Sequence, residues 1–281
     1  MSLNHVSVQR GSKIVFVYAL ALLATAFFAF PIFWMVTASL KSDHNITAYP
    51  PVWIFFTPSL QNYVKLVEEL GIVKMFINSA VIVGLSTCLA MACGTLAAYA
   101  LARFDIKNKQ LIAFEVLSIR MLPPIVSVVP MFILARWLGV FDTYWLLTAA
   151  YALSGLPFVV WVMRVFIQDI PQSIEEAALI DGCSRLETFW RVTLPLLMPG
   201  LAATMVIVFM FAWNEFLLAS MLTSNAAKTL PVIAANTLNA KSIAWGMASA
   251  AGVVMSLPVV VLVLLMQRYL VRGLTLGAVK G

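Results

Sequence analysis

The chain has 281 residues, of which 62% are hydrophobic and only 11% charged, whereas soluble globular domains carry about 25% charged residues. This much apolar surface cannot be buried in one core in water, which excludes an ordinary soluble domain. The net charge of +6 does not indicate nucleic-acid binding, because the basic residues stand singly at the ends of apolar runs and form no stripe with interleaved aromatics. The two histidines and three cysteines form no CxxC motif or Cys/His cluster, so we expect no metal site.

The apolar residues cluster into six runs long enough for membrane-spanning helices, each of which needs about 20 residues. We predict an all-α integral membrane protein, a single transmembrane domain over residues 1–281, with helices at 14–37, 76–102, 111–137, 144–166, 198–222 and 245–270. The first run exceeds the about 7–15 residues of a signal-peptide core, so it is interpreted as the first span. Prolines inside the runs, among them Pro123, Pro124 and Pro157, predict kinks.

The placement of lysine and arginine predicts the orientation. If the amino terminus is cytoplasmic, eleven of the 18 basic residues lie on the inside, six lie outside, and Arg120 falls within a span. Cytoplasmic loops of membrane proteins are enriched in Lys and Arg. We therefore expect both termini in the cytoplasm.

The first outer loop, residues 41–75, is the longest of the outer loops. Its first half is rich in proline, with Pro50, Pro51 and Pro58. The stretch from Ser59 to Tyr63 then offers a cap and start for a short interfacial helix ending near Gly71. A plain connecting loop is the alternative.

Residues 170–195, the 170–195 loop, are the longest polar stretch expected on the cytoplasmic side. Ser173 with Glu176 has capping-box spacing and predicts a helix start, and Gly182 can adopt the left-handed conformation that stops a helix. Ser184 with Glu187 repeats the capping-box spacing and predicts a second short helix to about Arg191. Pro195 is expected to end this module ahead of the fifth span. Two short helices at an angle would form a compact knob.

The first helix of the 170–195 loop has features of a docking element. Glu175 and Glu176 lie in its first turn, where the helix dipole favours acids. Ala177 and Ala178 are small, so the helix could sink into a groove on a partner while both acids pair with basic residues there. A helix lying on lipid head groups is the alternative, but inner-leaflet lipids are anionic and disfavour paired acids.

The pattern Glu176-Ala177-Ala178, three residues, Gly182, then Leu194-Pro195 resembles the EAA loop of permease subunits of ABC importers. Further segments resemble the sugar-importer branch, of the maltose-permease type, and the resemblance covers nearly the whole chain. They are Phe-Ile-Asn-Ser at 76–79, Ala-Tyr-Ala-Leu-Ala-Arg-Phe at 98–104, Met-Leu-Pro-Pro at 121–124, Trp-Asn-Glu-Phe at 213–216 and the tail at 273–281.

The resemblance implies that the 170–195 loop is a coupling helix docked in a cleft of a cytoplasmic ATPase. The residues that would carry this coupling are Glu175, Glu176, Ala177, Ala178, Asp181, Gly182, Leu194 and Pro195. It also implies that the carboxyl-terminal tail, 271–281, reaches between two ATPase subunits, with contacts from Gly277, Ala278, Val279, Lys280 and Gly281. Without the resemblance, that tail would be expected to be a disordered end.

The sequence has no GxxxxGK[ST] phosphate loop, so we expect no ATP hydrolysis by this chain and no cofactor bound to it. ATP and Mg²⁺ would be on the partner ATPase. The expected assembly contains a second permease subunit that is a different chain, two ATPase copies and an extracytoplasmic solute-binding protein in a bacterial inner membrane. The substrate class implied is a sugar, sugar alcohol or sugar derivative, with a polyol phosphate such as glycerol phosphate as the alternative. An ion-coupled secondary transporter is the rival from another class.

Polar residues within the spans are candidates for the translocation pathway, because ionisable groups in lipid are costly. Asn78, Asn214 and Glu215 are the candidates; a structural hydrogen bond to another helix is the alternative for Asn214 and Glu215. Glu115 and Arg120 are expected to serve packing or head-group anchoring instead.

Overall fold

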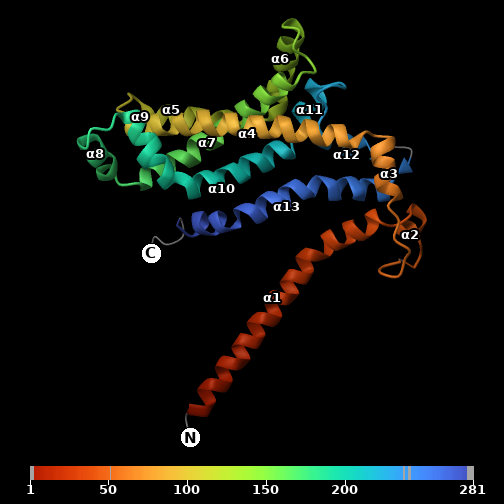
Figure 1. Cartoon of the computed structure of the whole chain (residues 1–281). Coiled ribbons are helices and arrows are strands. Elements are labelled where there is room, and N and C mark those ends of the chain that lie inside the picture. The colour runs from red at the N-terminus through yellow and green to blue at the C-terminus, as the bar shows by residue number, and fades with distance from the viewer. Residues whose placement is uncertain (1–2, 51, 237, 240–241, 277–281) are drawn as a thin grey trace. The chain divides into compact units, whose positions relative to one another are not determined.

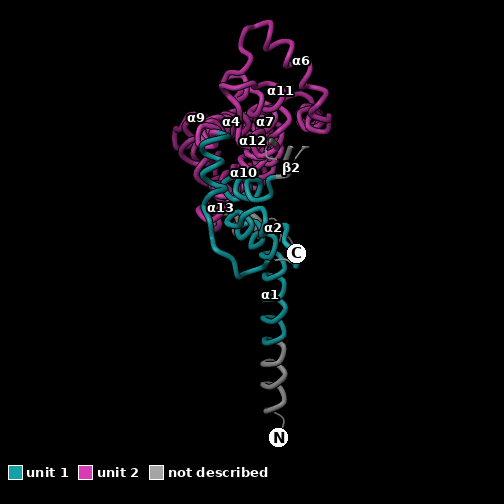
Figure 2. The backbone as a smooth tube through the Cα atoms, turned by 90° about the vertical axis from the view of Figure 1, so that its right-hand side faces the viewer, with its two compact units in different colours: residues 1–70, 236–254 teal, residues 71–235, 255–281 magenta. Residues whose placement is uncertain are grey.

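The computed structural model describes residues 3–50, 52–236, 238–239 and 242–276, which are almost entirely helical (Figure 1). The chain divides into two compact units (Figure 2). The first comprises residues 1–70 and 236–254, and the second comprises residues 71–235 and 255–281. The long helix α13, Trp245–Leu276, contributes to both.

The first unit contains the first predicted span, which lies in α1 (Leu3–Ser39). Its other elements are α2 (Asp43–Thr47), α3 (Gln61–Glu68) and the paired strands β1 (Leu238–Asn239) and β2 (Ser242–Ile243). Helix α3 confirms the short helix predicted after Ser59. Its Asn62 donates hydrogen bonds to the carbonyl oxygens of Ser39 (2.9 Å) and Lys41 (2.8 Å), so α3 is fastened to the end of α1.

Lys41 organises the loop between α2 and α3. The charge distribution places it in an outer loop, yet its side chain is fully buried. Its ammonium group donates to the carbonyl oxygens of Val52 (2.7 Å) and Trp53 (3.1 Å) and lies over the rings of Trp34 (4.6 Å) and Phe56 (4.8 Å). Carbonyl dipoles and aromatic faces thus replace water around the charge.

The second unit is a helical bundle around α4 (Ile72–Arg103) and α7 (Tyr144–Asp169), the most extensively packed pair. Its remaining elements are α5 (Lys109–Ser118), a 3-10 turn (Ile119–Met121), α6 (Pro124–Trp137), α8 (Gln172–Ile180), α9 (Arg185–Thr188), a π-helical turn (Phe189–Thr193), α10 (Leu194–Trp213), α11 (Leu217–Leu222) and α12 (Leu230–Asn236).

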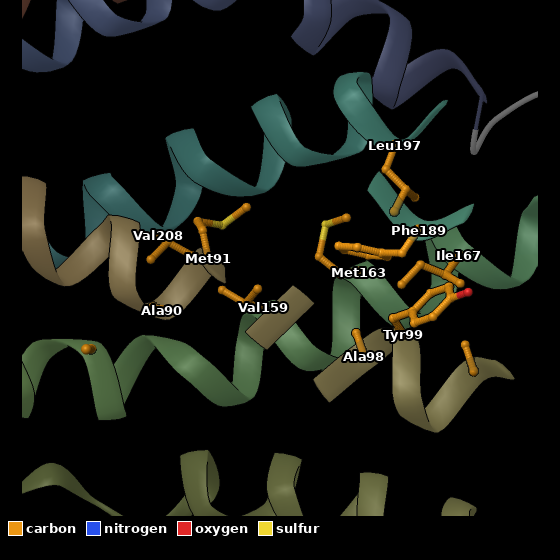
Figure 3. Close-up of a cluster of buried hydrophobic side chains, with 12 residues drawn as sticks. Ala90, Met91, Ala98, Tyr99, Val159, Met163, Ile167, Phe189, Leu197 and Val208 are labelled. Carbon is orange, nitrogen blue, oxygen red and sulfur yellow. The ribbon is translucent and has the colours of Figure 1, made fainter. Parts of the chain in front are cut away.

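Small residues permit the close approach of α4 and α7. A β-carbon built on Gly94 would lie 2.6 Å from Val159 Cγ1, so only glycine fits there. Ala90 and Ala98, one turn to either side, are buried in the same apolar cluster with Val159 and Met163 (Figure 3). This small-residue face of α4 therefore serves packing within the chain.

Five of the described helical segments are long and apolar enough to cross a membrane: Ile14–Ser39, Ile72–Arg103, Tyr144–Asp169, Arg185–Trp213 and Trp245–Gln267. A sixth span results if the bent pair Lys109–Met121 and Pro124–Trp137 is taken as one. The order of these segments along the chain agrees with that of the six predicted runs. The third and fifth runs, however, differ from the single helices that were expected.

The third run is not one straight helix, because its halves meet at 87°. Leu122 and Pro123 have extended backbones at the break. Proline lacks the N–H that continues a helix and disfavours helical geometry in the residue before it, so the pair Pro123-Pro124 ends the first half and starts the second.

The fifth run starts earlier and stops earlier than predicted. Pro195 was expected to end the 170–195 module, but this is wrong, because helical structure continues from Arg185 to Trp213. A π-helical turn precedes Pro195, and this wider turn accommodates the missing N–H. The helix ends at Asn214, whose side chain donates to Met210 O (2.8 Å), and Glu215 Oε1 accepts the Leu218 N–H (2.9 Å) at the start of α11.

Asp142 fastens the loop before α7 to the segment after α11. Its carboxylate accepts four backbone N–H groups, from Ser224 (3.0 Å), Asn225 (2.9 Å), Ala226 (2.9 Å) and Ala227 (3.1 Å). Burial alone raises the pKa of Asp142, but these four donors together lower it below its usual range.

We predict that Asp142→Asn destabilises the protein by about 1–3 kcal/mol at neutral pH, because an amide oxygen replaces a charged acceptor. Since the pKa of Asp142 is lower in the folded state, its contribution is present above the unfolded pKa and disappears as the pH falls through the folded pKa. Thermal unfolding of the purified protein across pH should show the gap between wild type and variant closing in acid. Asp105→Asn, at an exposed aspartate, is the control; the same pH profile for both variants would contradict this role.

Candidate functional site

The 170–195 loop folds into the predicted pair of short helices, α8 and α9, at the ends of α4 and α7 (Figure 1). The predicted stop is confirmed, because Gly182 has a φ of 92°. The Gly182 N–H bonds to Leu179 O (3.1 Å) and the Cys183 N–H to Ala178 O (3.0 Å). These two bonds satisfy the carbonyl groups at the end of α8 in a Schellman arrangement.

One of the two predicted capping boxes forms. Ser184 Oγ accepts the Glu187 N–H (3.3 Å), and Glu187 Oε2 accepts the Ser184 N–H (2.9 Å), so α9 starts as predicted. The box at Ser173 does not form, and this prediction is wrong. Helix α8 begins at Gln172, directly after Pro171 at the N-cap, so Ser173 lies inside the first turn and cannot cap the helix.

A buried ion pair ties α8 to the membrane helices. Glu175 Oε1 lies 3.0 Å from Arg103 Nε, and the two side chains are only 7% and 6% exposed. Glu175 Oε2 accepts the Tyr99 hydroxyl (3.2 Å), while Arg103 Nη2 donates to the carbonyl oxygens of Ile167 (2.8 Å) and Ile170 (2.9 Å). Arg103 therefore joins the end of α4, the end of α7 and the start of α8.

This geometry corrects the expectation that both acids of the loop are free to pair with a partner. Glu175 faces inward and is already paired, whereas Glu176 is exposed. Arg103 and Tyr99 were missed as site residues. Both stand in the 98–104 motif, but Arg103 was interpreted only as a charge at the end of a span, and the sequence alone does not show that it faces Glu175.

An aromatic contact supports the ion pair. The ring of Tyr99 lies 4.9 Å from that of Phe189 in the π-helical turn. Both belong to a buried cluster with Met163, Ile167 and Leu197 (Figure 3). Polar and apolar contacts therefore hold the whole α8–α9 pair against the ends of α4, α7 and α10.

The outer surface of the α8–α9 pair has the properties expected for docking. Glu176, Ala177, Asp181 and Gly182 are exposed, and Ala178 is half-buried. Ile180 beside them is 86% exposed, an apolar side chain at the tip of a polar loop. Two acids, small residues and an apolar tip form a surface suited to a partner with basic and apolar groups.

Leu194 and Pro195 lie elsewhere, at the start of α10, half-buried and exposed respectively. They belong to the continuous helix that carries the 170–195 loop into the fifth span rather than to its docking surface. The tail residues Gly277, Ala278, Val279, Lys280 and Gly281 lie outside the described residues, so their contact with an ATPase stays a prediction.

The pathway candidates separate into two groups. Asn78 is 1% exposed, donates to Ala226 O (2.9 Å) and Lys228 O (2.8 Å), and accepts from the Tyr144 hydroxyl. A residue buried and engaged in this way holds the segment after α11 in place, which argues against its assignment to the pathway. Asn214 and Glu215, by contrast, line a cavity of about 490 Å³.

Glu115 and Arg120 also differ from each other. Glu115 is exposed on α5, in keeping with a surface position. Arg120 points inward: its Nη1 donates to Ser154 O (3.0 Å), and its guanidinium lies over the rings of Phe211 (4.6 Å) and Phe158 (5.4 Å). Its position is therefore not that of a head-group anchor.

Comparison with known proteins gives consistent results. Residues 90–276 match the family described as "Binding-protein-dependent transport system inner membrane component". The chain is 34% identical to the sulfoquinovosyl glycerol transport system permease protein SmoH of Agrobacterium fabrum, over 96% of this chain and 95% of that protein. It is 36% identical to the trehalose/maltose transport system permease protein MalG of Thermococcus litoralis, over 93% and 95% respectively.

Among solved structures, a chain of a bacterial ABC transporter involved in the import of the acidic polysaccharide alginate has the same fold. The TM-score is 0.75 at 22% identity, covering 93% of this chain and 97% of that chain.

We predict that Arg103→Met or Glu175→Leu alone destabilises the protein by about 3–5 kcal/mol, because each leaves one buried charge without its partner. The double variant should recover much of that loss, since it removes both charges. Thermal unfolding of the four forms in a double-mutant cycle measures the coupling.

The exposed pair Glu187–Arg191, 3.7 Å apart, is the matched control, and Arg191→Met, which leaves the Glu187 capping box in place, should change little. Losses at positions 103 and 175 no larger than those of the control would contradict the anchoring role.

Proposed function

The chain belongs to the family of binding-protein-dependent transport system inner membrane components, and we propose that it is a permease subunit of an ATP-driven importer, coupled to its ATPase through the 170–195 loop. The observation that carries this proposal is the buried Arg103–Glu175 pair. It fixes an exposed docking helix to the ends of two membrane helices.

The proposed coupling works by rigid-body motion. Glu176, Ala177, Ala178, Asp181 and Gly182 would enter a cleft of the ATPase, so closure of the ATPase on ATP displaces α8. Because Arg103 binds both Glu175 and the last carbonyl groups of α7, that displacement acts on α4 and α7. The continuous helix Arg185–Trp213, which includes Leu194 and Pro195, carries it into the fifth span.

The partners follow from what one chain can supply. Without a phosphate loop, this chain needs ATP and Mg²⁺ bound to a separate ATPase, which we propose is present in two copies. Five or six spans are few to enclose a pathway, so a second permease subunit, a different chain, would form the other half. The family description includes a binding protein, which would deliver the solute from outside. Both termini would lie in the cytoplasm of a bacterial cell.

A carbohydrate is the proposed substrate class. Two relatives that align with almost the whole chain have names that refer to trehalose and maltose and to sulfoquinovosyl glycerol. These are sugars or sugar derivatives, which supports a sugar, sugar alcohol or derivative over a polyol phosphate. Membership of the family removes the basis for an ion-coupled secondary transporter.

We predict that Gly182→Asp lowers ATP hydrolysis stimulated by loaded binding protein by about tenfold, equivalent to about 1.4 kcal/mol of lost coupling. The φ of 92° strains any residue with a β-carbon, and the new carboxylate adds charge to the docking surface. The measurement uses the complete complex reconstituted in lipid.

Gly139→Asp is the matched control. Gly139 also has a positive φ (69°) and open space around it, but it lies in the loop after α6, outside the 170–195 loop. Equal stimulation in the Gly182 variant and wild type would contradict the docking assignment. A wild-type chain that copurifies with no ATPase would contradict the proposed function itself.

A further inference from the structure

Two interruptions of helical structure lie close together in the second unit. The first lies between α5 and α6 and contains Arg120 in its 3-10 turn. The second lies between α10 and α11 and contains Asn214 and Glu215. Helices α6 and α11 are packed against each other, so the two breaks lie close together. Broken helices at which polar groups converge are a recurring setting for solute binding in transporters.

Arg120 has hydrogen-bonding capacity that the fold does not use. A guanidinium carries five N–H groups, and one of them bonds to Ser154 O. Among the described residues, no carboxylate lies within 4.0 Å of it, so its charge is balanced only by the faces of Phe211 and Phe158. An ionised group in a membrane segment without an ion-pair partner is costly, which points to a ligand rather than to stability.

Asn214 and Glu215 bring complementary groups. One carboxylate oxygen of Glu215 caps α11, and the amide of Asn214 caps α10 through a single N–H. An ionised carboxylate has about four acceptor sites, and an asparagine has a second N–H and a carbonyl oxygen. Capping therefore accounts for only part of what these two side chains can bind.

The three residues border adjoining spaces. Arg120 and Glu215 both line a narrow cleft of about 30 Å³. Glu215 and Phe211 also line the larger cavity of about 490 Å³, together with Asn214, Ser154 and Pro124. This volume lies within the range of about 300–1,000 Å³ that is usual for small-molecule sites.

We infer that this cavity, lined by Phe211, Asn214 and Glu215, together with the adjoining cleft lined by Arg120, binds a neutral polyhydroxylated carbohydrate, an inference that rests on the proposed function. Sugar hydroxyl groups both donate and accept, so they match a guanidinium, an amide and a carboxylate together. The C–H faces of a sugar ring match Phe211 and Pro124. Because the charges of Arg120 and Glu215 are opposite, an anionic sugar would meet the Glu215 carboxylate close to Arg120, the one cation among the residues that line the two spaces.

The test uses the complete complex in lipid nanodiscs. A panel of neutral oligosaccharides, sugar alcohols and phosphorylated, sulfonated or carboxylated sugars is first screened against the solute-binding protein by thermal shift. Binding of the best ligand, tritium-labelled, to the vanadate-trapped complex is then measured, with binding protein alone subtracted. We expect a neutral ligand, and at least about tenfold weaker binding for Arg120→Gln and Glu215→Gln, the loss typical of a charged hydrogen bond.

Arg136→Gln is the matched control, because Arg136 also stacks over two phenyl rings, Phe132 (5.4 Å) and Phe141 (4.1 Å), but lines neither the cavity nor the adjoining cleft; this variant should bind the ligand as wild type does. Arg120→Lys keeps the charge and should recover part of the binding, which a purely structural role would not predict. An anionic best ligand would overturn the substrate class, and unchanged binding in both glutamine variants would overturn the site. Failure of the proposed function itself would appear separately, as wild-type ATP hydrolysis that loaded binding protein does not stimulate.

Discussion

The buried contact between Arg103 and Glu175 is the interaction on which the proposed coupling depends. An exposed loop that is merely flexible cannot transmit force, and α8 on its own is too short to be a stable helix. The ion pair, the Tyr99 hydroxyl and two α7 carbonyl groups fix α8 with satisfied polar partners in a nearly dry environment. Separating the two groups would leave each charge buried without a partner, so the arrangement is held in one geometry.

Proline and polar residues divide the second unit into rigid and interrupted parts. Pro195 follows a π-helical turn and leaves its helix continuous, so the path from the 170–195 loop into the fifth span is unbroken. Pro123 and Pro124 do interrupt their helix, and Asn214 and Glu215 cap the ends of a second interruption. In the proposed mechanism the continuous elements serve coupling, whereas the interrupted ones surround the cavity.

Much of this fold could be predicted from the sequence, because long apolar runs and local capping signals depend on neighbouring residues only. The order of spans, the left-handed stop at Gly182 and the cap at Ser184 were predicted in this way and are confirmed. The inward orientation of Glu175 and the burial of Asn78 depend on contacts with distant residues, which periodicity does not reveal. The same holds for the two helix breaks, since a proline pair is compatible with a kink as well as with an 87° bend.

The rigid connection between α8 and α4 is tested most directly by a spin-label distance between Ser173→Cys and Leu96→Cys, both at exposed positions, with Cys88, Cys93 and Cys183 replaced. Pulsed electron paramagnetic resonance on the reconstituted complex would be recorded without nucleotide and with ATP trapped. A rigid connection predicts one narrow distance that is the same in both states and broadens in Glu175→Gln. A distance that changes between the two states in the wild-type chain would contradict it.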